Sequence, residues 1–133
     1  MRYQRAESPA HLNGHDAARR FFSPCFGEHS ELERLWVAHL DDSAQCIHLE
    51  CYDGERESVG LPVREIMIDA ARLGSVGVVL AHNHPSGDAR PSYADCRATR
   101  KLALAGEAMD LAILDHLVFA AGDCSSMRRM GLL

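Results

Sequence analysis

The chain has 133 residues and a mass of 14.7 kDa, which is enough for one domain and too little for two. Its 47% hydrophobic and 25% charged residues are typical of a globular protein and exclude a disordered one. No apolar run approaches the roughly 20 residues that span a bilayer, and the polar N-terminus lacks the apolar segment of a signal peptide. We therefore expect a cytoplasmic protein that does not act at a membrane.

Charge and cysteine content narrow the class of protein further. The 19 acidic residues outnumber the 14 basic ones and give a net charge of −5, so direct non-specific binding to nucleic acid is not expected. The five cysteines contain no C-x-x-C pair and follow no zinc-finger spacing. We interpret them as reduced thiols that mostly fill the core.

The first half of the chain predicts a hairpin followed by a helix. Signals are weak before residue 32, where only a short helix at 16–22 is expected. An apolar run and an alternating segment then predict paired strands at 35–40 and 46–52. The next helix is expected to begin at Pro62 and end at Gly74, because proline suits the first turn of a helix and glycine the residue after its end.

The second half predicts a buried strand, a long helix and more strands. The continuous apolar run at 76–81 is typical of a strand that is covered on both faces. The remaining elements follow in chain order: a helix from near Ser92, strands at 111–114 and 117–120 around the pair Asp115-His116, and a turn at Gly122-Asp123 before a short tail. Mixed strands with helices packed on them indicate an α/β or α+β fold.

The segment His82-Asn83-His84, after the buried strand, carries the candidate chemistry. Alternate residues at a strand end project to the same side, so the two imidazoles can converge. Asp95, one turn into the next helix, can add an oxygen ligand, which fills three of the four positions of a tetrahedral zinc site. An open fourth position is typical of catalytic zinc, which activates water. The pattern predicts such a site, with Ser92 placed to donate to an oxyanion.

A structural interpretation of these residues stays open. H-x-H pairs are common in cores and on surfaces, where they bind no metal. Ser92-x-x-Asp95 is also a capping box, in which serine caps the helix and the acid complements its dipole. The capping and catalytic roles are compatible, so the motif predicts a helix start whether or not a metal binds.

The stretch AHNHPSGDARPSYAD, followed by LAILDHLVFAAG and the terminal GLL, closely resembles the JAB/MPN (JAMM) metalloenzyme domain of bacterial RadC-like proteins. The resemblance covers roughly residues 32–133. It implies a mixed β-sheet flanked by helices, similar to that of cytidine deaminases. It also implies zinc held by His82, His84 and Asp95, with Ser92 supporting the oxyanion. The best-known members of the family are zinc isopeptidases that remove ubiquitin-like proteins.

This chain departs from the family pattern at its N-terminus, and the identity of its catalytic glutamate stays open. RadC-like proteins usually carry a helix-hairpin-helix segment before this domain, and the chain is too short to hold one. We divide it into an N-terminal segment at 1–30, whose role is unknown, and a JAB/MPN domain at 31–133. The family places a catalytic glutamate near the start of the first core strand. Glu33 matches that position best, and Glu50 in the second strand is the alternative.

Together these observations predict a cytoplasmic zinc hydrolase of the JAMM type that cleaves a peptide or isopeptide bond in a protein or peptide substrate. The alternative is a non-catalytic RadC-like interaction module in a DNA-repair or mobile-element complex. A nuclease that uses the same metal is a weaker rival, because the acidic balance opposes it. The sequence leaves a homodimer open.

Overall fold

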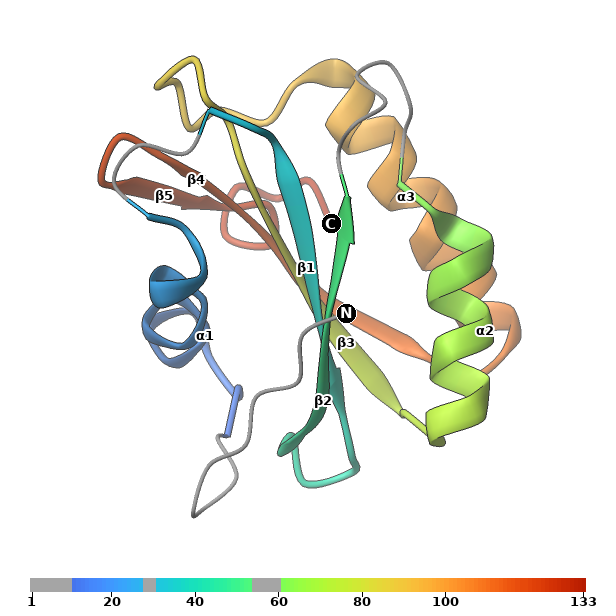
Figure 1. Ribbon diagram of the computed structural model, residues 1–133. Coiled ribbons are helices and arrows are strands. Elements are labelled where there is room, and N and C mark those ends of the chain that lie inside the picture. Colours follow the sequence, from blue (N-terminus) through green and yellow to red (C-terminus); the bar gives the residue numbers. More distant parts are fainter. Residues whose placement is uncertain (1–10, 28–30, 54–60) are drawn as a thin grey trace.

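The computed structural model describes residues 11–27, 31–53 and 61–133, and it forms a five-stranded mixed sheet with helices on both faces (Figure 1). The strand order is β2-β1-β3-β4-β5, and β3 and β4 form the parallel pair. The strands are β1 (Arg34–Leu40), β2 (Cys46–Asp53), β3 (Gly77–Asn83), β4 (Ala112–Ala120) and β5 (Asp123–Ser126). This architecture confirms the expected α/β class and is consistent with a JAB/MPN fold.

The helices form a layer on each side of the sheet. The helix α1 (His15–Phe22) and the short 3-10 helix η1 (Ser23–Cys25) cover one face, while α2 (Val63–Leu73) and α3 (Tyr93–Ala108) cover the other (Figure 1). The alternation of strand side chains divides the core accordingly. Trp36 and Ala81 pack with Phe22 on the α1 side, whereas Val37 and Leu80 pack against the α2 and α3 side. The central strands are therefore covered on both faces, as the apolar run predicts.

The helix ends follow the sequence signals. Gly74 ends α2 in the left-handed region at φ 72°, a conformation that glycine adopts without a steric penalty. At the start of α3, Ser92 accepts a hydrogen bond from the Asp95 amide and the Asp95 carboxylate accepts one from the Ser92 amide, which completes the capping box. The short helix expected at 16–22 is also present, one residue longer.

The end of the chain differs from the prediction in two places. β4 is one continuous strand rather than two strands around Asp115-His116. Both polar side chains are buried and hydrogen-bonded, Asp115 to Ser126 and His116 to Thr99, so their polarity does not mark a loop. The expected short tail also contains β5, which pairs with β4 beyond a tight turn at Ala121 and Gly122. The four polar or small residues of β5 carry no strand signal of their own, because the pairing with β4 determines their extended conformation.

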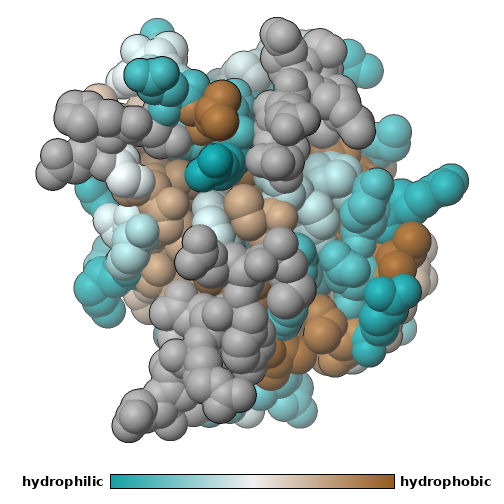
Figure 2. All heavy atoms as spheres, viewed as in Figure 1, coloured by the Kyte–Doolittle hydropathy of each residue, from teal (hydrophilic) through white to brown (hydrophobic). Residues whose placement is uncertain are grey.

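No helix in the described ranges is long and apolar enough to cross a membrane. None of the five cysteines forms a disulfide, and burial raises the pKa of Cys46 and Cys124 to about 11, so both stay protonated at neutral pH. Figure 2 shows hydrophilic and hydrophobic residues intermixed over the described part of one face. Of the N-terminal segment 1–30, residues 1–10 and 28–30 lie outside the described ranges, while Leu12 and α1 belong to the core.

Candidate metal site

The fold brings the candidate residues together at one corner of the sheet. β1 and β3 are antiparallel and pair Leu35 with His82, so the start of β1 lies beside the end of β3. The loop after β3 carries His84 and leads into the first turn of α3, which carries Asp95. The end of β3, the loop after it and the first turn of α3 therefore meet beside the start of β1.

Three ligand atoms form a compact triangle at this corner. His84 Nε2 lies 3.0 Å from His82 Nε2 and 3.0 Å from Asp95 Oδ2, and His82 Nε2 lies 3.4 Å from the same carboxylate oxygen. Ligands of a tetrahedral zinc ion, each about 2.0–2.1 Å from the metal, are about 3.3 Å apart. The spacing of the side chains matches what a single metal ion of this size requires.

The hydrogen bonds around the triangle fix the protons of both imidazoles. Thr99 donates its hydroxyl to the Asp95 carbonyl, so it accepts from His116 Nδ1 (2.8 Å), and His116 Nε2 in turn accepts from His82 Nδ1 (2.7 Å). His84 Nδ1 donates to the backbone carbonyl of Asp88 (2.8 Å). The Nε2 atoms of neutral His82 and His84 therefore present lone pairs, as metal-bound histidines do.

This arrangement fits a cation better than it fits an empty cluster of side chains. Two imidazole lone pairs and a carboxylate oxygen face one another at 3.0–3.4 Å, which is repulsive unless a positive charge lies between them. Without a metal ion, a proton can supply this charge. The hydrogen bond that a protonated His84 donates to Asp95 raises the pKa of His84. Burial alone raises the pKa of Asp95, but hydrogen bonds donated by the His82 and His84 rings when a proton lies in the cluster outweigh burial and lower that pKa overall. Burial holds the pKa of His116 well below its ordinary value, so it stays neutral.

The structure places Glu33, and not Glu50, beside this cluster. Glu33 lies just before β1, is half exposed, and has its Oε2 3.9 Å from His82 Nε2. One ligand atom from each of Glu33, His82 and His84 lies within 4.8 Å of the other two, which marks the group as able to hold a metal ion. Glu50 lies in the edge strand β2 and is hydrogen-bonded to His48 at 2.8 Å.

Ser92 is exposed and lies beside the cluster, because its amide donates a hydrogen bond to the Asp95 carboxylate. Its Oγ accepts the Asp95 amide, and its side chain donates no hydrogen bond to any residue in the described ranges. The hydroxyl hydrogen is therefore available to a ligand. The residue thus caps α3 and also exposes a donor beside the carboxylate, as the two compatible interpretations of its motif require.

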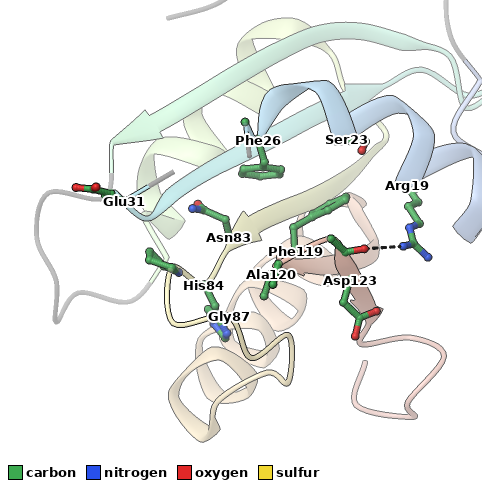
Figure 3. Close-up of a pocket in the computed structure, with 14 residues that line it drawn as sticks. Arg19, Ser23, Phe26, Glu31, Asn83, His84, Gly87, Phe119, Ala120 and Asp123 are labelled. Carbon is green, nitrogen blue, oxygen red and sulfur yellow. Dashed lines mark hydrogen bonds between the residues drawn. The ribbon is translucent and has the colours of Figure 1, made fainter. Parts of the chain in front are cut away.

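A pocket of about 690 Å³ adjoins the cluster on the α1 side of the sheet. Figure 3 shows Phe26 and Phe119 along this pocket, with Asn83 and His84 toward one end and Arg19 toward the other. The two phenyl rings lie 5.0 Å apart between centroids, and Arg19 donates to the Gly122 carbonyl. The pocket is therefore partly aromatic, and it shares His84 with the candidate metal site.

Sequence reasoning left His116 and Thr99 at this corner unassigned. The structure separates the pair Asp115-His116: His116 contacts His82, whereas Asp115 accepts hydrogen bonds from Ser126 at the end of β5 and from the Arg128 amide just after it. Thr99 was not singled out. Its only signal was its position four residues after Asp95, which places it on the same face of α3.

The sheet, its helices and this corner define a small α/β protein with a candidate metal site. The sequence profile of the RadC-like JAB domain matches residues 12–132, and the chain belongs to this family. The match begins at Leu12 and so includes α1, and the division at residue 30 stays a prediction.

Two curated relatives support this placement. A UPF0758 protein of Symbiobacterium thermophilum is 40% identical over 106 residues, which are 79% of this chain and 45% of the relative. A UPF0758 protein of Chloroflexus aggregans is 34% identical over 105 residues, which are 78% and 46% of the two chains. This chain thus spans slightly less than half the length of each relative.

Proposed function

We propose that this protein is a zinc-dependent hydrolase of the JAMM type that cleaves a peptide or isopeptide bond. The observation that carries the proposal is the triangle of His82 Nε2, His84 Nε2 and Asp95 Oδ2, with Glu33 alongside. Two nitrogen donors and one oxygen donor suit zinc, and three protein ligands leave a position for substrate or water. A zinc ion held there would act as a Lewis acid and lower the pKa of water toward ~7.

The side chains around this position supply the remaining chemistry. Glu33 is half exposed and 3.9 Å from His82, so its carboxylate can take a proton from the attacking water and deliver it to the leaving amine. The Ser92 hydroxyl can donate to the substrate carbonyl oxygen as negative charge develops on it. The aromatic pocket beside His84 is suited to an apolar side chain next to the scissile bond.

Metal content and two matched glutamate variants test the proposal. Elemental mass spectrometry of protein purified without a metal-affinity tag should find close to one zinc per chain. Glu33→Gln should keep the zinc and lower turnover of fluorogenic peptide or isopeptide-linked lysine substrates by about 10²–10⁴-fold, because a positioned base contributes that much. Glu50→Gln is the control and should retain turnover. Full activity in Glu33→Gln, or loss in Glu50→Gln, would refute the assignment of the base.

The test also separates the rival functions. Stoichiometric zinc without hydrolysis of any such substrate would favour an interaction module of a DNA-repair or mobile-element complex. A shift of DNA that weakens with salt would favour nucleic-acid binding, which the net charge of −5 opposes. We place the protein in the cytoplasm, in keeping with its five cysteines, none of which forms a disulfide. A homodimer stays a proposal that light scattering can test.

A further inference from the structure

We propose that Asn83 is a positioning residue that holds Glu33 beside the metal ligands, an inference that rests on the proposed role of Glu33. The side-chain oxygen of Asn83 accepts a hydrogen bond from the Arg34 amide at 2.8 Å. Its side-chain nitrogen donates to the Leu32 carbonyl at 3.0 Å. These two backbone groups belong to the residues on either side of Glu33. One buried amide therefore clamps the backbone at the position that carries the proposed base.

The clamp lies where the backbone ladder of the sheet ends. The last paired residues of β1 and β3 are Leu35 and His82, so Arg34 and Asn83 would form the next pair. There the Asn83 side chain replaces the backbone ladder and makes hydrogen bonds to the Leu32 carbonyl and the Arg34 amide. Glu33 lies beyond the last paired position with β3, and the contacts of Asn83 are what join its two neighbours to that strand.

Burial makes these hydrogen bonds effective restraints. Asn83 is only 5% exposed, so water competes poorly for the amide. The Glu33 side chain is 50% exposed, and its place near His82 depends on where the backbone puts its Cα atom. Catalytic groups lose activity steeply when they move by an ångström or so, because their geometry must match the transition state. A clamp on the neighbouring backbone supplies the needed restraint.

Asn83 acts on Glu33 without belonging to the metal cluster. Adjacent residues of a strand point to opposite faces, and Asn83 lines the pocket on the α1 side while His82 contacts His116 on the α3 side. The geometry needs one acceptor and one donor on a short side chain. Asparagine provides both, aspartate provides only the acceptor, and alanine provides neither. In the segment His82-Asn83-His84, the two histidines are thus the metal ligands and the asparagine between them positions Glu33.

The experiment compares Asn83→Ala and Asn83→Asp with Ser126→Ala in the zinc-loaded chain of 133 residues. Ser126 is a matched control, because it is 3% exposed and also makes one donated and one accepted side-chain hydrogen bond. The first measurement is hydrogen exchange at the Arg34 amide. It should rise at least tenfold in Asn83→Ala and stay unchanged in Ser126→Ala. Equal exchange in wild type and Asn83→Ala would overturn the clamp, and this result needs no substrate.

The second measurement is peptide hydrolysis with and without Glu33→Gln. Asn83→Ala should keep one zinc per chain, lower kcat by about 10–100-fold and leave KM within threefold, with a smaller loss in Asn83→Asp. In the Glu33→Gln background, Asn83→Ala should cause no further loss, since both changes disable the same group. An additive loss would overturn the positioning role. If Glu33→Gln alone kept full kcat, the proposed base would fail, while the exchange result would still decide the clamp.

Discussion

His116 provides the sharpest test of how this corner prepares a metal ligand. The ring is fully buried, and it accepts a hydrogen bond from His82 Nδ1 at 2.7 Å while donating to Thr99 at 2.8 Å. In His116→Ala, the His82 N–H loses its acceptor in a place that water reaches poorly. A buried donor without a partner costs about 1–3 kcal/mol. Loss of the group that orients a metal-binding histidine costs 10–100-fold in metal affinity, or about 1.4–2.7 kcal/mol. We therefore expect zinc affinity to fall by 10–100-fold.

Competition with a chelator of known zinc affinity measures this effect directly. His116→Gln should recover much of the affinity, because its side-chain carbonyl can accept the His82 N–H from a similar position. Thr99→Val keeps the shape of the side chain but removes the hydroxyl that accepts from His116. Its zinc affinity should lie between those of wild type and His116→Ala. Thermal unfolding of each zinc-free variant shows whether the fold survives. Zinc affinity within twofold of wild type in a folded His116→Ala protein would refute this account of the His82 lone pair.

Three further predictions address the ligand, a buried histidine and a close contact. Asp95→Ala should abolish stoichiometric zinc by elemental analysis. Ser92→Ala should keep the zinc and lower the free energy of unfolding by about 1 kcal/mol, because it removes the helix cap and no metal ligand. Burial lowers the pKa of His39 to about 4, so the unfolded chain binds the extra proton between pH 6.5 and 4 and stability falls as pH falls through that window. Urea titrations across the window should show about 3 kcal/mol less acid destabilisation in His39→Asn than in wild type. Gly106→Ala would place its Cβ 2.5 Å from the Leu111 carbonyl oxygen. It should lower the free energy of unfolding by about 1–3 kcal/mol, although alanine has the better helix propensity. An unchanged urea midpoint would show that α3 can shift to relieve the contact.

The parts of the fold that could be predicted are those with local causes. Gly74 and Ser92 end and begin helices through backbone conformation and hydrogen bonds made within a few residues. β4 was wrongly divided because its polar pair is satisfied by residues far along the chain, Ser126 and Thr99, and this compensation leaves no mark in the segment itself. The strand β5 depends in the same way on its partner and not on its own residues.

The residues of the candidate site also divide into those that a local pattern predicts and one that depends on a distant part of the chain. His82, His84 and Asp95 lie within one strand-loop-helix unit, so spacing alone could suggest that they meet. Glu33 lies 49 residues before His82 in the chain, and its place beside it follows from the pairing of Leu35 with His82. Resemblance to a family favoured Glu33, whereas periodicity could not choose it over Glu50. The pairing of β1 with β3, which lie far apart in the chain, determines which glutamate reaches the corner.

The position of Asp95 shows how one residue resolves a conflict in the electrostatics of the corner. The N-terminus of a helix carries a partial positive charge and so disfavours a nearby cation. Asp95 Oδ2 accepts the Ser92 amide at 2.8 Å, and the same oxygen faces His84 Nε2 at 3.0 Å. The carboxylate thus offsets the partial positive charge at the N-terminus of α3, and its remaining negative charge faces the imidazoles. An α-helix that begins beside the two histidines can therefore border a cation site, because its first turn supplies the charge that the cation requires.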